Sequence, residues 1–130
     1  QVHSIKYNCS GRLMLIEDDL DVAYSEKAIL SAFGYDVVHF TDGLEAINSF
    51  DNNSAGYDLI ITDILMPKLD GVQFTNLLRK KDSKIPILFL TGDSENIYDL
   101  ISNVNPKDRK LKKPFNLIEL SNIIEDMLRK

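Results

Sequence analysis

Six side chains that could together carry phosphoryl chemistry end or follow short apolar runs in this sequence of 130 residues. They are Glu17, Asp18, Asp19, Asp63, Thr91 and Lys113. Carboxylate oxygens with room for water suit Mg²⁺ better than Zn²⁺, which prefers nitrogen and sulfur ligands. Beside a bound cation, one carboxylate can attack phosphorus to form an aspartyl phosphate. A hydroxyl and an ammonium can then stabilise the phosphoryl oxygens.

These side chains meet only if the chain alternates between strands and helices. Short apolar runs predict strands at 13–16, 37–40, 59–62 and 86–90, with a weaker fifth strand at 109–113. Apolar residues at helical spacing predict helices at 20–33, 43–50, around 72–78, at 97–104 and at 117–128. The first, third and fourth strands are apolar throughout, which is typical of strands covered on both faces of a parallel sheet.

This alternation predicts one α/β domain with an open, doubly wound parallel sheet. The carboxyl ends of parallel strands share one edge, and binding sites form there, where the strand order reverses. All six side chains fall at strand ends, so we expect them to converge at this edge. We expect neither His3 nor His39 near it.

Composition excludes several other classes of protein. Fifteen basic and 20 acidic side chains give a formal charge of −5, which argues against direct nucleic-acid binding by this domain. The single cysteine, Cys9, excludes an internal disulfide. No apolar run approaches the length of a membrane span, so no membrane association is expected. Residues 1–11 are weakly patterned, and we interpret them as a leader or linker.

Four motifs in order resemble the receiver domain of bacterial-type two-component response regulators. They are LMLIEDD, LIITDILMPKLDG, ILFLTG and LKKPF. The resemblance covers residues 12–130 and implies a receiver domain over that range. It implies the flavodoxin-like receiver fold, a five-stranded parallel sheet in the order 2-1-3-4-5 flanked by five helices.

The resemblance also implies a magnesium site. In that family the residues at Glu17 and Asp18 hold Mg²⁺, directly or through water, together with the phosphoacceptor at Asp63. The backbone carbonyl two residues after the acceptor, here that of Leu65, completes the site.

Three further roles follow from the same resemblance. Asp63 is implied as the phosphoacceptor, Thr91 as the residue that coordinates the phosphoryl group, and Lys113 as its cationic partner. The bond from Lys113 to Pro114 is typically cis in the family.

The implied function is a phosphorylation-dependent signalling switch in the cytoplasm. A histidine kinase or phosphotransfer domain donates the phosphoryl group, and a conformational change relays it to an attached or separate output domain. Homodimers are compatible with the family. Such a domain catalyses only its own phosphorylation and dephosphorylation, and no turnover of a metabolite is expected.

One position departs from the family pattern. Lys110 lies three residues before Lys113, where the family usually has Tyr or Phe, which swings inward on activation. A lysine cannot bury its charged end cheaply, so we predict an altered switch and a less standard dimerisation surface.

Two alternative functions stay open. A pseudo-receiver would use the same fold only as a binding module; the departure at Lys110 keeps this alternative open, whereas the intact acidic pair, Asp63 and Lys113 argue against it. A magnesium-dependent phosphohydrolase with an aspartyl nucleophile would need a general acid two residues after Asp63, where Leu65 stands.

Simpler structural roles also compete at single positions. Asp19 is better explained as a helix cap or a solvated residue than as a ligand. Thr91 begins a Thr-Gly-Asp sequence that also suits a turn. Lys113 belongs to a basic cluster, and the only role of these charges could be to keep an edge strand from pairing with another chain. The apolar stripe of the last helix is interpreted as core packing.

Overall fold

The computed structural model describes residues 9–52, 56–64, 69–81, 84–92 and 105–129. Its strands are β1 (Arg12–Ile16), β2 (Asp36–Phe40), β3 (Leu59–Asp63), β4 (Ile87–Thr91) and β5 (Arg109–Lys112). Its helices are α1 (Leu20–Ala32), α2 (Gly43–Asn52), α3 (Gly71–Lys81) and α4 (Leu117–Leu128). Among these residues, no helix has the length and apolar character needed to cross a membrane.

The five strands form one parallel sheet in the order β2-β1-β3-β4-β5. This order confirms the predicted doubly wound fold. Four helices are described, whereas five were expected; the helix expected at 97–104 lies outside the described residues. The strand bounds differ from prediction by small amounts, and Asp63 and Thr91 are the last residues of β3 and β4 rather than the first residues beyond them.

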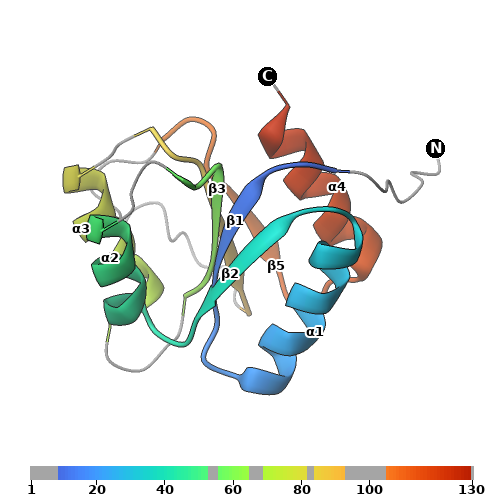
Figure 1. Ribbon diagram of the computed structural model, residues 1–130, viewed down its shortest axis with the longest axis horizontal. Helices are drawn as coiled ribbons and strands as arrows, with labels where there is room; N and C mark the ends of the chain where they lie inside the picture. The colour runs from blue at the N-terminus through green and yellow to red at the C-terminus, as the bar shows by residue number, and fades with distance from the viewer. Residues whose placement is uncertain (1–8, 53–55, 65–68, 82–83, 93–104, 130) are drawn as a thin grey trace.

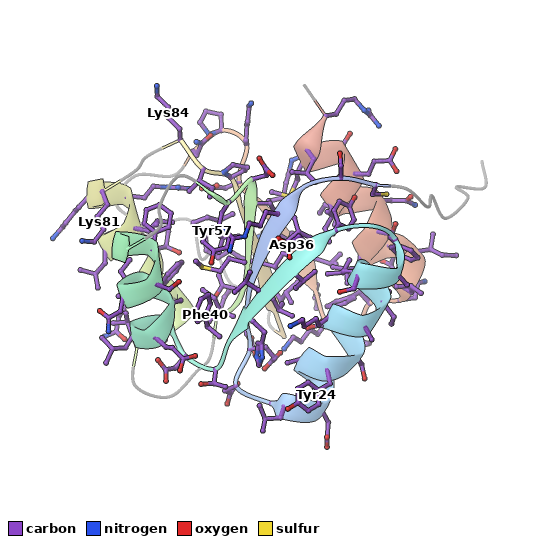
Figure 2. All side chains as sticks on the ribbon, viewed as in Figure 1. Tyr24, Asp36, Phe40, Tyr57, Lys81 and Lys84 are labelled. Carbon is purple, nitrogen blue, oxygen red and sulfur yellow. The ribbon has the colours of Figure 1, made fainter. Side chains whose placement is uncertain are left out.

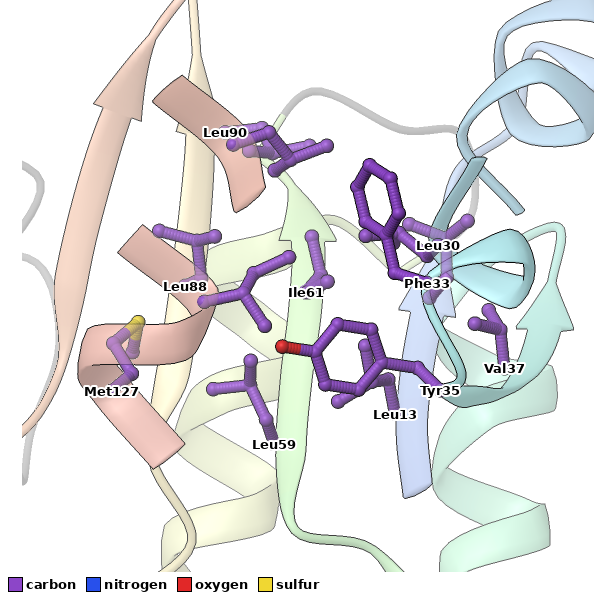
Figure 3. Close-up of a cluster of buried hydrophobic side chains, with 13 residues drawn as sticks. Leu13, Leu30, Phe33, Tyr35, Val37, Leu59, Ile61, Leu88, Leu90 and Met127 are labelled. Atoms are coloured by element: carbon purple, nitrogen blue, oxygen red, sulfur yellow. The ribbon is translucent and has the colours of Figure 1, made fainter. Parts of the chain in front are cut away.

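Helices cover both faces of the sheet, as Figure 1 shows: α2 and α3 lie on one side and α1 and α4 on the other. Alternating side chains of each central strand therefore enter two separate cores. Met14 and Ile16 of β1 pack with Phe50 and Phe74 in the first core. Leu13 and Leu15 face the second core, where strand residues meet Leu30 of α1 and Met127 of α4 (Figure 3).

The ends of α1 are set by local chemistry. The Asp19 side chain accepts hydrogen bonds from the N–H groups of Asp21 and Val22, so it is the N-cap that the sequence indicated. At the other end the N–H of Gly34 donates to Ser31 and that of Tyr35 donates to Leu30. Gly34 has a φ of 111°, which suits a glycine in this closing turn.

The outer surfaces of the helices carry few large apolar groups. Tyr24 projects from the outer side of α1 and is 64% exposed (Figure 2). On the last helix, Asn116 and Glu119 form a capping box, and Leu120, Ile124 and Met127 are buried. The stripe of α4 is therefore core packing, as predicted.

Candidate functional site

Sheet topology brings the expected side chains to one edge of the molecule. Glu17 follows β1, Asp63 and Thr91 end β3 and β4, and Lys113 follows β5. This edge holds the loop from β1 to α1, at the bottom of the view in Figure 1. The residues come from four segments that are far apart in sequence, so only the parallel arrangement of the strands unites them.

Three carboxylates converge closely enough to share a cation. One oxygen each from Glu17, Asp18 and Asp63 lies within 4.8 Å of the others. Glu17 is buried, Asp63 is half-buried and Asp18 is exposed, so the cluster opens to water on one side. An oxygen-only set with room for water suits a hard divalent cation such as Mg²⁺.

The Glu17 side chain carries a buried carboxylate oxygen that a cation could bind. Its Oε2 accepts a hydrogen bond from the N–H of Asp19 at 3.1 Å. Its Oε1 is buried and has no hydrogen-bond partner among the described residues. A buried carboxylate oxygen without a partner is unfavourable, and a bound cation would satisfy it. The donor set therefore fits the expected metal.

Burial raises the pKa of Glu17 to about 7. The hydrogen bond from Asp19 opposes this rise, the charge of Asp63 adds to it, and the charge of Lys113 opposes it. The neighbouring Asp18 carboxylate also raises this pKa, because it favours the protonated form of Glu17. Burial, together with the neighbouring carboxylates, thus disfavours ionisation of Glu17.

The backbone of Glu17 is held by β2. Its N–H donates to the carbonyl of Phe40 at 3.0 Å, and its carbonyl lies 2.8 Å from Nε2 of His39. The expectation that His39 lies away from this edge is therefore wrong. Because β2 runs parallel to β1 with His39 opposite Leu15, the ring reaches the segment after β1. The position of His39 next to the end of its strand was the available signal.

Lys113 makes a direct ion pair with Asp63. Its Nζ lies 3.1 Å from Oδ2 of Asp63, and the side chains are 36% and 13% exposed. The N–H of Lys113 donates to the carbonyl of Thr91 at 2.7 Å, which fixes the lysine beside the end of β4. The Lys113–Pro114 peptide bond is cis, as the family resemblance implied.

The backbone of Asp63 is enclosed by its neighbours. The hydroxyl of Thr62 donates to the Asp63 carbonyl at 2.9 Å, and the N–H of Gly71 donates to the carbonyl of Ile64. A Cβ added at Gly71 would lie 2.6 Å from the Asp63 carbonyl oxygen. Glycine is therefore required where α3 begins, because the helix passes directly against the backbone of the acidic site.

The remaining expected residues have distinct outcomes. Thr91 is buried at the end of β4, next to the ion pair. Leu65, whose carbonyl was expected to complete the metal site, lies outside the described residues. Lys110 is exposed on β5, opposite Phe89 of β4.

One acidic residue near this edge was missed from sequence. Glu26 is only 9% exposed although it is a carboxylate, and it shares the buried face of α1 with Ala23 and Leu30. The charges of Glu17, Lys113 and Asp63 all act on it. The 3- and 4-residue spacing of Ala23, Glu26 and Leu30 placed it on one helix face, but a carboxylate on that face is usually expected to reach water.

Comparison with known proteins gives one consistent family. The family model described as the response regulator receiver domain matches residues 13–125. The response regulator receiver protein CpdR of Brucella abortus is 36% identical over 118 residues, which are 90% of this chain and 96% of that protein. The uncharacterized transcriptional regulatory protein YcbL of Bacillus subtilis is 33% identical over 117 residues, which are 90% of this chain. The chain covers 50% of the length of that relative.

Solved structures agree with this result. The receiver domain of the hybrid histidine kinase CckA has a TM-score of 0.78 at 28% identity, covering 92% of this chain and 100% of that one. The receiver domain of the sensor histidine kinase PA1611 from Pseudomonas aeruginosa has a TM-score of 0.79 at 28% identity. That match covers 92% of this chain and 98% of the other, whose structure has a magnesium ion coordinated in the active site cleft.

Proposed function

The chain belongs to the response regulator receiver domain family, and from this membership we propose that Asp63 is its phosphoacceptor. The family serves two-component signalling, and its members are phosphoacceptor domains rather than enzymes acting on metabolites. The observation that carries the proposal is the position of the Asp63 carboxylate. It lies 3.1 Å from the Lys113 ammonium and within 4.8 Å of the carboxylates of Glu17 and Asp18.

Members of this family bind Mg²⁺ at the acidic site. In this chain the metal would be held by Glu17, Asp18 and Asp63, with the backbone carbonyl of Leu65 as a further ligand. When bound, the metal supplies positive charge that offsets the negative charge of the phosphoryl oxygens. The unpartnered Oε1 of Glu17 supports this assignment.

The residues then divide the reaction between them. A carboxylate oxygen of Asp63 attacks phosphorus, the phosphorus–nitrogen bond to the donor histidine breaks, and the imidazole nitrogen keeps the electron pair. Lys113 pairs with a phosphoryl oxygen, and the Thr91 hydroxyl donates a hydrogen bond to another. Attack by water on the same phosphorus later breaks its bond to the Asp63 oxygen, which keeps the electron pair, and inorganic phosphate leaves. The domain in this way catalyses only its own phosphorylation and dephosphorylation.

The proposed partner is a histidine kinase or a phosphotransfer domain. Residues 12–130 form the receiver domain, and residues 1–11 act as a leader or linker. The output domain is attached or separate, with a homodimer as one way to couple to it, and the protein acts in the cytoplasm. The relatives support the variety of outputs, because they include a transcriptional regulatory protein and a sensor kinase.

A small phosphodonor tests the assignment of Asp63. The protein is incubated with acetyl phosphate and Mg²⁺, and its intact mass is measured after acid and after base treatment. We expect the mass gain of one phosphoryl group, stable in acid and labile in base, which Asp63→Asn abolishes. Asp36→Asn removes an exposed carboxylate at the start of β2 and should leave the gain unchanged.

Each other outcome contradicts the proposal. A folded protein that gains no mass behaves as a pseudo-receiver. A gain that persists in Asp63→Asn places the acceptor elsewhere. Steady release of phosphate from metabolites would indicate a phosphohydrolase.

A further inference from the structure

Glu26 is a buried carboxylate for which the proposed reaction has no use. It is 9% exposed, and α1 buries it between Ala23 and Leu30 on the face that packs on the sheet. Its Oε1 has no hydrogen-bond partner within the described part of the chain. An aliphatic side chain would fill this position at lower free energy, because burying an uncompensated carboxylate is costly. The carboxylate at this position is therefore not explained by packing alone.

The charged groups that act on Glu26 are those of the site itself. They are Glu17 after β1, Lys113 after β5 and Asp63 at the end of β3. Burial is the largest cause that raises the pKa of Glu26, to about 7; the charge of Glu17 adds to it, that of Lys113 opposes it, and that of Asp63 adds to it. Glu17 and Glu26 are both buried, so water screens the interaction between these two carboxylates less than at the surface.

Glu26 does not share the cation as a ligand. Among the described residues, the one group of three or more such ligands within 4.8 Å of one another is Glu17, Asp18 and Asp63, and Glu26 is not part of it. Glu26 therefore acts on the site through its charge and not through a bond. A negative charge that interacts with Glu17 and Asp63 attracts a cation in the cluster and repels an anion bound to Asp63.

We propose that Glu26 is a further residue of this site, whose buried negative charge strengthens divalent-cation binding and weakens the hold on the phosphoryl group. This inference rests on the proposed function of Asp63. It gives Glu26 opposite effects on the two ligands, which a purely structural residue would not have. An ionised Glu26 therefore favours the state with bound divalent cation and without a phosphoryl group.

The experiment compares Glu26→Gln with Asp21→Asn. Both changes remove one carboxylate charge from α1, but the Asp21 side chain is exposed and screened. Mg²⁺ affinity is measured by calorimetry at about pH 8, and beryllofluoride, an anionic mimic of the phosphoryl group, is then titrated at saturating Mg²⁺. We expect Glu26→Gln to weaken Mg²⁺ binding about fivefold or more and to strengthen beryllofluoride binding by a similar factor. Asp21→Asn should change either constant less than about twofold.

The pH profile gives a second readout. At about pH 6 Glu26 is largely protonated in the wild type, so the Mg²⁺ affinities of the wild type and Glu26→Gln should converge. If Glu26→Gln does not fold, as judged by circular dichroism, Glu26→Leu replaces it and the same signs are expected.

Three results would overturn the inference. They are equal affinities in Glu26→Gln and wild type, weaker binding of both ligands in the variant, and a ratio of Mg²⁺ affinities independent of pH. Failure of the proposed function is a separate result, because wild-type protein would then gain no phosphoryl group from acetyl phosphate whatever residue stands at position 26.

Discussion

The Nζ of Lys113 lies 3.1 Å from Oδ2 of Asp63, although the two residues are 50 positions apart and their strands are not neighbours. β4 lies between β3 and β5, so the lysine side chain reaches across the end of β4 to the carboxylate. The N–H of Lys113, bonded to the Thr91 carbonyl, fixes the starting point of this reach. Under the proposed function, the ammonium at this position would compete with a cation for Asp63 and would attract a phosphoryl group.

Removal of this ammonium should change cation and phosphoryl binding in opposite directions. In Lys113→Met we expect Mg²⁺ affinity to rise about two- to fivefold, because the half-exposed pair with Asp63 contributes up to about 1 kcal/mol. Phosphorylation by acetyl phosphate should slow, since the charge that stabilises the phosphoryl oxygens is lost. Calorimetry and the rate of mass gain measure the two effects. Lys112→Met, an exposed neighbour, is the control, and an equal effect there would contradict the role of Lys113.

The stability of the metal-free protein should depend on pH through Glu26. Its pKa is about 7 in the folded state and near 4.5 when unfolded, so the unfolded chain releases its proton first as pH rises. The free energy of unfolding then falls between about pH 4.5 and pH 7 and stays low above that range. In Glu26→Gln we expect a gain of about 1–3 kcal/mol at pH 8 and little change at pH 4.5.

Urea unfolding in the presence of EDTA measures this difference at both pH values. The pKa of Glu17 is also raised in the folded state, so the free energy of unfolding of the variant still falls with pH, although less steeply. A variant that is less stable than wild type at pH 8 would show that Glu26 contributes a favourable interaction in the folded state.

The buried ion pair between Arg79 and Asp108, at the opposite edge of the sheet from the site, should contribute strongly to the free energy of unfolding. The side chains of Arg79 and Asp108 are both 0% exposed. The Nη2 atom of Arg79 lies 2.7 Å from each carboxylate oxygen of Asp108. Asp108 also accepts from the N–H groups of Ile87 and Asn105. Asp108→Ala should destabilise the protein by about 3–5 kcal/mol, because a guanidinium is left buried without its counter-charge.

An exposed ion pair provides the comparison in denaturant titrations. Asp126 pairs with Arg109 at 3.2 Å on the surface, and Asp126→Ala should cost at most about 1 kcal/mol. Equal losses in Asp108→Ala and Asp126→Ala would contradict the importance given to burial.

Much of this arrangement could be predicted from sequence, because the strong signals are local. The apolar strands end at chemically distinct residues, so Asp63 and Lys113 could be placed at one edge without coordinates. The place of His39 near the end of β2 was a signal for this edge, but the contacts of His39 and Glu26 could not be derived from strand ends alone. Whether a polar side chain on β2 or α1 faces solvent or a neighbouring loop depends on how the elements pack. The burial of Glu26 contradicts the usual preference of carboxylates for water, so its helix position alone did not reveal it.

The close approach of α3 to Asp63 should make Gly71 intolerant of a side chain. Gly71→Ala places a methyl group against the Asp63 carbonyl, and the helix or the end of β3 must shift to accept it. We expect a loss of about 1–3 kcal/mol in stability and slower phosphorylation. Gly92→Ala is the matched control, since nothing lies within 4 Å of its added Cβ. Unaltered phosphorylation and stability in Gly71→Ala would show that the Asp63 backbone is not confined by α3.

The switch position should respond to phosphorylation without burying its side chain. Lys110 is exposed on β5 opposite Phe89, and moving its ammonium into the interior would cost several kcal/mol, so only its aliphatic stem can pack inward. On adding beryllofluoride and Mg²⁺ we expect amine acetylation at Lys110, measured by mass spectrometry, to change less than about twofold. Acetylation at Lys113 should fall strongly in the same sample, because its ammonium pairs with the bound anion, and this confirms that the site is loaded. Equal protection of the two lysines from acetylation would mean that Lys110 turns inward, as the family's aromatic residue at this position does. The prediction of an altered switch would then be wrong.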